Sequence, residues 1–218
     1  MKREHLKLSP VMAWIAVHYE SMRDRSIGFS VAALLAGALA ACAPSVSPVD
    51  FSQGAQSQRD YPNWRLAAVS VVIPASMPVS ENPNVRIPPD GYLNWWGDPP
   101  GDRKQQVRAL LSEAVSSGAA PLLTGSTPVI FEIKVNQFHA LTPKARATEL
   151  QLGVHSMNFD FAVIDKASGA RLTEENNVNA DLRAYSGSYA VIAEQQGQNQ
   201  KLRIQNRIAD VVSSWLTN

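Results

Sequence analysis

The sequence is poor in the residues and motifs that most often carry catalysis or bind metals. Cys42 is the single cysteine among 218 residues, which excludes an internal disulfide framework. The sequence contains no G-x-S-x-G elbow, no H-E-x-x-H, no Walker loop and no G-x-G-x-x-G. We therefore expect a protein that is not an enzyme and that has no dissociable cofactor.

Charge is also sparse and balanced. From Cys42 onward there are fifteen Lys plus Arg and sixteen Asp plus Glu, a net charge of −1. Binding to nucleic acid needs clustered positive charge to neutralise phosphates. The composition therefore argues against a nucleic-acid partner.

Long apolar runs are rare as well, and the clearest one lies near the start. Arg23 and Arg25 precede the run from Ile27 to Ala41, whose fifteen residues are apolar or small except for one serine. A basic region, a short apolar region and small residues before a cleavage point are typical of a secretory signal peptide. An uncleaved transmembrane helix is the alternative, but such a helix needs roughly 20 residues. Cys42 as an ordinary buried thiol is a further alternative, although no periodic apolar pattern surrounds it.

The end of this run, Leu39-Ala40-Ala41-Cys42, resembles the lipobox of bacterial lipoproteins. The resemblance implies cleavage between Ala41 and Cys42, a diacylglyceryl group on the Cys42 sulfur and an acyl chain such as palmitate on the new amino terminus. Each buried methylene contributes about 0.8 kcal/mol, so two or more chains hold a protein stably at a membrane. The residue after the cysteine is Ala43 and not Asp. In lipoproteins of this type, the lack of Asp at this position favours export to the outer membrane, where the protein faces the periplasm.

These features divide the chain into four parts. Residues 1–21 are expected to be an upstream extension, because Met22 with Arg23 makes a better start for a signal peptide. Residues 22–41 are the predicted lipoprotein signal peptide, and residues 42–60, rich in Pro, Ser and Gln, are the lipidated cysteine and a flexible tether. Residues 61–218 are long enough for one domain with a hydrophobic core.

Hydrophobic periodicity predicts the class of this domain. An unbroken apolar run predicts a central strand buried on both faces, and alternating apolar residues predict two half-buried strands joined by a polar turn over residues 142–148. Apolar residues at helical spacing predict two helices, of which the first begins at the N-cap Asp102 and stops at Gly118. The predicted fold is α+β, with a mainly antiparallel sheet of about four strands and both helices on one face. The predicted elements are a strand over Trp64–Ile73, a helix over Asp102–Ser117, strands over Pro128–Phe138, Gly153–Asp165 and Arg171–Tyr185, and a helix over Gln200–Leu216.

An aromatic cluster stands out in the proline-rich segment between the first strand and the first helix. Tyr92, Trp95 and Trp96 fall within five residues of the run Gly91–Asp98. Aromatic side chains concentrate binding energy at interfaces, so these three residues are a candidate surface for a partner. They could equally close an irregular loop over the sheet or the first helix, in which case at least one tryptophan is buried.

Two histidines follow Cys42 in the chain, and their positions allow a second hypothesis. If the predicted hairpin turns about residue 147, His139 and His155 lie directly opposite each other on one face of the sheet. Such a pair could bind a metal or a small ligand, or act as a proton-sensitive latch. A slip of one residue in the register removes the pair from that face. Alternatively each histidine forms its own hydrogen bond at the end of the apolar face, since a stable zinc site usually needs three or four protein ligands.

Part of the sequence resembles an uncharacterised family of proteobacterial lipoproteins with a domain of unknown function. The resemblance lies in residues 128–133, 138–146 and 153–159 and in the ending Asp165-Lys166-Ala167-Ser168-Gly169. The plan of a lipidated cysteine, a tether and a small α+β domain is also similar to accessory lipoproteins of the cell envelope, including transporter-associated lipoproteins and activators of wall synthases. The resemblance implies a lipid-anchored protein that binds a further envelope component, most simply another protein.

Overall fold

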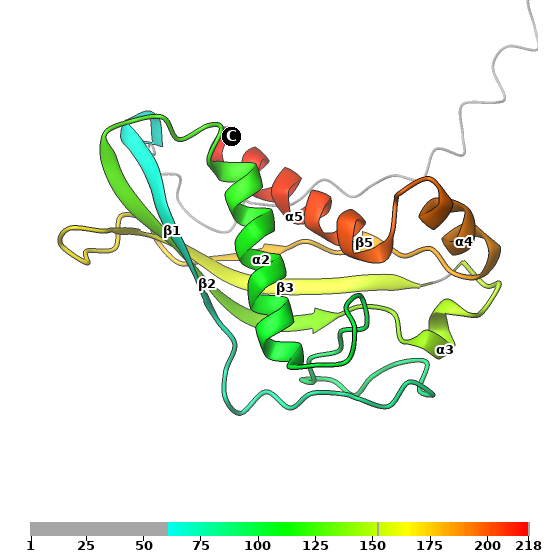
Figure 1. Cartoon of the computed structure of the whole chain (residues 1–218). Helices are drawn as coiled ribbons and strands as arrows, with labels where there is room; N and C mark the ends of the chain where they lie inside the picture. The colour runs from blue at the N-terminus through cyan, green and yellow to red at the C-terminus, as the bar shows by residue number, and fades with distance from the viewer. Residues whose placement is uncertain (1–60, 152, 218) are drawn as a thin grey trace, which may run out of the picture. The chain divides into compact units, whose positions relative to one another are not determined.

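Residues 61–151 and 153–217 are described by the computed structural model (Figure 1). The predicted signal peptide, Cys42 and the predicted tether over residues 42–60 lie outside these residues. In chain order the elements are η1 (Tyr61–Asn63), β1 (Trp64–Val72), α2 (Arg103–Ala119), β2 (Thr127–His139), α3 (Pro143–Arg146), β3 (Val154–Asp165), β4 (Asn176–Asn179), β5 (Leu182–Arg183), α4 (Gly187–Gln195) and α5 (Gln200–Thr217).

The strands form one mixed sheet. Its order is β1-β2-β3-β4, and β5 also pairs with β3. The β2–β3, β3–β4 and β3–β5 pairs are antiparallel, whereas β1 runs parallel to β2. The sheet is therefore mainly antiparallel, and the predicted α+β class is confirmed.

The position of β1 corrects one prediction. We expected a central strand buried on both faces, but β1 lies at the edge of the sheet, where its one neighbouring strand among the described residues is β2. The helix α2 connects β1 to β2, and a crossover of this kind places the second strand parallel to the first. Leu66 and Val69 in β1 are partly buried against the core, while Val72 remains 45% exposed.

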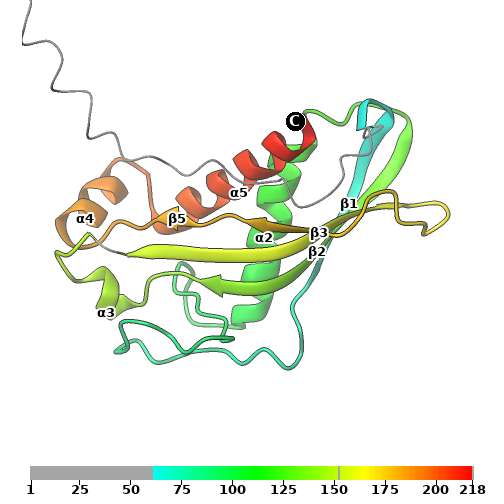
Figure 2. The same ribbon diagram turned by 180° about the vertical axis from the view of Figure 1, so that it is seen from behind.

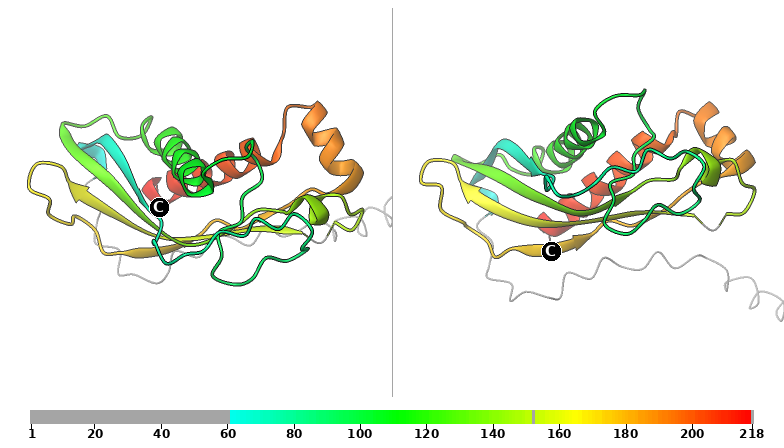
Figure 3. Two further views of the ribbon diagram at one scale, coloured as in Figure 1. Left: turned by 60° about the horizontal axis from the view of Figure 1, so that its bottom comes forward. Right: turned by 90° about the horizontal axis from the view of Figure 1, so that it is seen from below.

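Helices α2 and α5 pack side by side on one face of the sheet, as predicted (Figure 3). The predicted N-cap of α2 is confirmed, because the Asp102 carboxylate accepts a hydrogen bond from the Gln105 backbone N–H at 3.0 Å. Gly118, by contrast, does not stop the helix, which continues to Ala119. A Cβ atom at Gly118 would lie 2.3 Å from the backbone oxygen of Ala209 in α5, so this glycine lets the two helices approach closely.

The core lies between this helix pair and the sheet. Phe131 of β2, Phe161 of β3 and Trp215 of α5 are all buried and meet edge to face. The ring centroids are 4.9 Å apart for Phe131–Phe161 and 4.7 Å apart for Phe161–Trp215. Aromatic pairs in this geometry stabilise the fold beyond the burial of their surface. No helix in the described part of the chain is long and apolar enough to cross a membrane.

The segments after β2 and β3 are more structured than predicted. Residues 142–148 were expected to be too short and polar for an element, but they contain α3, because the Thr142 hydroxyl caps the Ala145 backbone N–H and Pro143 starts the helix. The single strand predicted over Arg171–Tyr185 is split into β4 and β5. Asp181 interrupts it, and its carboxylate accepts the hydrogen bond of the Met157 backbone N–H at 2.9 Å. Helix α4 follows, and it lies with α3 at the opposite end of the sheet from the β3–β4 connection (Figure 2).

Candidate functional site

The aromatic segment is attached to the end of β2. The Asn94 backbone N–H donates to the Phe138 carbonyl at 2.9 Å, and the Ala140 N–H donates to the Asn94 carbonyl at 3.0 Å. The Asn94 side-chain amide also donates to the Ala140 carbonyl. Because these bonds continue the ladder beyond β1, the proline-rich loop is held in register with the sheet.

Trp95 points into the core. Its side chain has no exposed surface, its ring meets Phe138 edge to face at 5.8 Å, and its Nε1–H donates to Asp98 at 2.8 Å. The ring also lies against Gly97, where a Cβ atom would be 2.2 Å from the indole. Trp95 is therefore a buried anchor of the loop and contributes no surface to a partner.

Trp96 takes the opposite role. It is half-buried, and its Nε1–H donates to the Asn94 side-chain oxygen at 2.8 Å. The guanidinium of Arg103 lies 5.2 Å from the centre of the indole ring. Arg103 is itself 6% exposed and donates to the carbonyls of Asp98 and Pro99 at 3.2 and 3.1 Å. The indole is thus fixed in position while part of it remains accessible.

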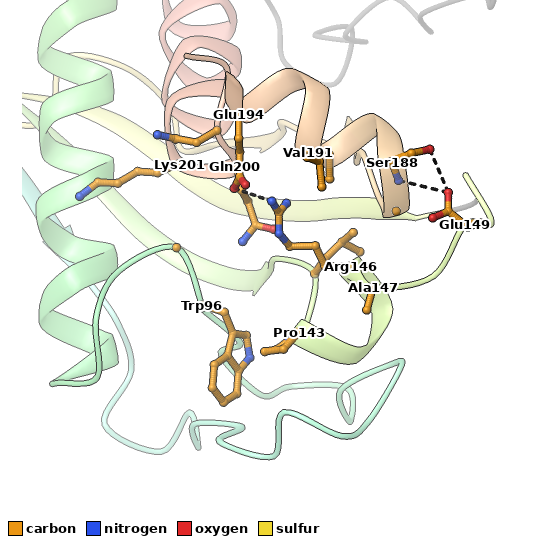
Figure 4. Close-up of a pocket in the computed structure, with 15 residues that line it drawn as sticks. Trp96, Pro143, Arg146, Ala147, Glu149, Ser188, Val191, Glu194, Gln200 and Lys201 are labelled. Carbon is orange, nitrogen blue, oxygen red and sulfur yellow. Dashed lines mark hydrogen bonds and ion pairs between the residues drawn. The ribbon is translucent and has the colours of Figure 1, made fainter. Parts of the chain in front are cut away.

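A pocket of about 770 Å³ opens beside Trp96 (Figure 4). It lies between the aromatic loop, α3, α4 and the first residues of α5. Tyr92 and Trp95 do not line it, so of the three predicted aromatic residues only Trp96 reaches this pocket. Its apolar wall consists of Trp96, Leu141, Pro143, Ala147, Ala190 and Val191.

The charged side chains around the pocket have partners within the protein. Arg146 of α3 forms an ion pair with Glu194 of α4, and the Glu149 carboxylate accepts hydrogen bonds from the Ser188 backbone N–H and hydroxyl at 3.1 and 3.0 Å (Figure 4). Glu149 thereby caps the positive end of α4. The charges of this wall are compensated internally, which leaves the apolar residues together with the polar Asn199 and Gln200 as its contact surface.

Lys201 at the start of α5 links the pocket to the aromatic loop. Its ammonium lies 2.7 Å from the Asp98 carboxylate, the same carboxylate that Trp95 holds. Burial raises the pKa of Asp98, but the hydrogen bonds from Lys201 and Trp95 outweigh burial and leave the pKa below its ordinary value. Asp98 therefore stays ionised and fixes the loop to α5.

The predicted histidine pair is not formed. The predicted register is correct from Val129–Asp165 to Val135–Phe159, but a bulge between Val135 and Gln137 shifts the pairing by one residue. His139 consequently lies opposite Ser156, and His155 points to the other face of the sheet. The hypothesis that His139 and His155 form one metal site is therefore wrong.

Each histidine has its own surroundings. His139 donates from Nε2 to the Tyr92 carbonyl at 2.5 Å, and its Nδ1 lies 3.4 Å from the Gln137 amide nitrogen. His155 is 1% exposed, and burial, with smaller contributions from the guanidiniums of Arg203 and Arg146, lowers its pKa from 6.5 to about 3. Within residues 61–151 and 153–217, no group of three or more His, Cys, Asp or Glu side chains is arranged to hold a metal.

The pocket residues on α3 and α4 were not predicted as a site. Arg146 and Glu149 are three residues apart, but Glu194 lies 45 residues further along the chain, and the three residues belong to no motif. The one available signal was the polar turn over residues 142–148, which has two basic residues in its last helical turn. Only the fold brings these side chains to one wall, where Arg146 of α3 pairs with Glu194 of α4.

Comparisons with known proteins give a family and two structural likenesses. A family model described as a family of unknown function (DUF6778) matches residues 64–218. The chain is similar to a PelC dodecamer from Paraburkholderia phytofirmans at 12% identity, over 71% of this chain and 89% of that chain, with a TM-score of 0.34. It is also similar to a candidate lipoprotein from Caulobacter crescentus CB15 at 21% identity, over 50% of this chain and 82% of that chain, with a TM-score of 0.27. A search of the curated proteins found no match.

Proposed function

The chain belongs to the family of unknown function DUF6778, and because this membership assigns no activity, we propose a function from the site itself. The protein is a non-enzymatic binding module, anchored by lipid on Cys42 to the outer membrane and facing the periplasm. Its pocket beside Trp96 receives an apolar segment of another envelope protein. The observation that carries the binding role is the pocket of about 770 Å³ with Trp96 fixed at its side.

The anchor is supported by the sequence before the domain. Two arginines, the apolar run Ile27–Ala41 and the single cysteine follow the order of a lipoprotein signal. The segment from Cys42 to Tyr61 could span roughly 60 Å when extended, at about 3.3 Å per residue. A tether of this length would let the folded domain reach partners at the membrane surface or away from it.

The pocket supports a binding role by its size and by its wall. Pockets that bind ligands commonly enclose about 300–1,000 Å³, and in their walls apolar side chains stand beside a few polar groups. Trp96 is of the residue type that most often dominates binding energy at interfaces, and Arg103 and Asn94 hold it before a partner arrives. A side chain that is already ordered loses less entropy on binding.

The charges of the pocket favour an apolar partner over a charged substrate. Glu194 forms an ion pair with Arg146, and Glu149 accepts a hydrogen bond from the start of α4. Neither carboxylate is therefore free for proton transfer. A charged ligand would have to displace one of these contacts. An aliphatic or aromatic segment would instead cover Trp96 and Val191 without breaking any of them.

Purification from intact membranes tests both parts of the proposal. Mass spectrometry of the amino-terminal peptide should show a diacylglyceryl-modified Cys42, and an unmodified thiol would refute the anchor. Trp96→Ala should reduce co-purification of a specific envelope protein at least tenfold. Leu172→Ala, at a residue 40% exposed outside the pocket, is the matched control and should have no effect. Equal recovery with both variants would refute binding at this pocket.

A further inference from the structure

Helix α4 exposes its large side chains and buries its small ones. Tyr189, Val191 and Ile192 are 61%, 53% and 52% exposed, whereas Ala190 and Ala193 are 3% and 6% exposed. A helix on the surface of a soluble domain normally turns its large apolar residues toward the core. The outer face of α4 is therefore an apolar surface that the described residues leave uncovered.

A fourth exposed apolar residue, from another part of the chain, lies beside the start of α4. Leu150 is 63% exposed. The Ser186 hydroxyl donates to the Leu150 carbonyl at 2.9 Å, and the Gln151 amide donates to the Ser186 carbonyl at 2.6 Å, so residues 150 and 151 are fastened beside the start of α4. We refer to Leu150, Tyr189, Val191 and Ile192 as the α4 patch. Helix α4, which carries three of these four residues, lies at one end of the domain (Figure 2).

The charges near the patch are those that suit a phospholipid surface. The acidic side chains of this end, Glu149 and Glu194, are held by Ser188 and Arg146. Lys144 and Arg183 are exposed, and neither takes part in an ion pair among the described residues. The Arg183 guanidinium donates to the Gln151 carbonyl at 3.5 Å, which places this cation beside Leu150. An exposed cation at the edge of an apolar face complements the phosphate groups of a bilayer.

We propose that the α4 patch lies on the bilayer that holds the lipidated Cys42, with Tyr189 and Ile192 at the boundary between headgroups and acyl chains. The inference rests on the lipid anchor of the proposed function. A tyrosine beside aliphatic residues suits this boundary, because the ring is apolar and its hydroxyl stays hydrated. Such a helix is expected to sink about 5–10 Å below the headgroup surface.

The anchor explains why a patch of this modest size is sufficient. A tethered site meets its surface at an effective concentration on the order of millimolar, so a contact that is weak in solution becomes populated. The thirteen residues of β2 extend for about 43 Å at roughly 3.3 Å per residue. The tether of roughly 60 Å is longer than this strand, so either end of the domain can reach the membrane. Contact through α4 would also hold the pocket close to the bilayer, because Val191 lines both.

Spin labels on the lipidated full chain test the inference. When Cys42 is acylated, a new cysteine is the one free thiol, so Ile192→Cys can be labelled selectively. Leu172→Cys is the matched control, because Leu172 is 40% exposed in the β3–β4 connection, at the opposite end from α4. The two labelled chains are placed in vesicles of phosphatidylethanolamine and phosphatidylglycerol. Power saturation with oxygen and with a water-soluble nickel complex then reports the depth of each label.

The inference predicts that the label at residue 192 is protected from the nickel complex at least fivefold relative to the label at residue 172. Equal accessibility of both labels overturns it. Protection that arises only after envelope proteins are added also overturns it and identifies a protein as the occupant. Before labelling, the unsubstituted chain is treated with a maleimide. Reaction at Cys42 would refute the anchor and this inference together, whereas a blocked Cys42 with two equally accessible labels would refute the inference alone.

Discussion

The two adjacent tryptophans should respond to the same substitution in opposite ways. Trp95→Ala removes a completely buried indole, its edge contact with Phe138 and its hydrogen bond to Asp98. Removing a buried tryptophan costs about 3–5 kcal/mol, because the lost contacts leave a cavity. Trp96→Ala removes a half-buried ring with one hydrogen bond and one cation–π contact, each worth about 1 kcal/mol.

Urea unfolding followed by circular dichroism measures this difference directly. With a slope of about 2 kcal/mol per molar urea, the midpoint should fall by roughly 1.5–2.5 M for Trp95→Ala and by about 1 M or less for Trp96→Ala. Partner recovery should show the reverse order when it is corrected for the folded fraction. A loss below about 1 kcal/mol for Trp95→Ala, or equal losses for the two variants, would refute the assignment of one tryptophan to the core and one to the site.

Three further predictions follow from close contacts and from burial. Gly97→Ala should destabilise the fold by about 1–3 kcal/mol in the same urea assay, because the new methyl group would overlap the Trp95 ring. Gly118→Ala should lower the melting temperature, although alanine is the better helix former by about 1 kcal/mol, because its methyl group would meet the α5 backbone; a rise in melting temperature would show that the helices do not approach as described. The pKa of His155 is lowered from 6.5 to about 3 in the folded protein. Between these two pH values the unfolded chain binds a proton at His155 that the folded chain does not bind. The free energy of unfolding should therefore fall as the pH falls from 6.5, by up to about 1.4 kcal/mol per pH unit. Urea titrations at pH 4, 5 and 7 should show a smaller loss for His155→Gln, and parallel curves for the variant and the unsubstituted chain would contradict the burial of this imidazole.

The alternation of apolar residues was enough to predict the long strands and their pairing. The predicted register of β2 and β3 holds at the end remote from the turn, where the alternation of apolar residues fixes which side chains share a face. The bulge between Val135 and Gln137 could not be predicted, because no glycine or proline marks it. That single extra residue moved His139 out of line with His155 and removed the basis of the metal hypothesis.

The site was predicted only in part, for reasons that lie in particular residues. The aromatic cluster was visible in the sequence, but two adjacent tryptophans in a loop carry no periodicity that separates the buried one from the accessible one. Helix α4 was missed because its alanines face inward and its large residues face outward, the reverse of the pattern by which a helix is recognised. The edge position of β1 depends on the path of α2, so it cannot be predicted from the composition of the strand itself.

The most direct test of the central claim is photocrosslinking at the pocket in intact envelopes. A benzoyl-phenylalanine at position 96 should form an adduct with one defined envelope protein, while the same group at position 172 should form none. The adduct should disappear when Val191→Glu places a charge on the opposite wall of the pocket. No adduct at position 96, or identical adducts at positions 96 and 172, would contradict the proposal that this pocket is the binding site.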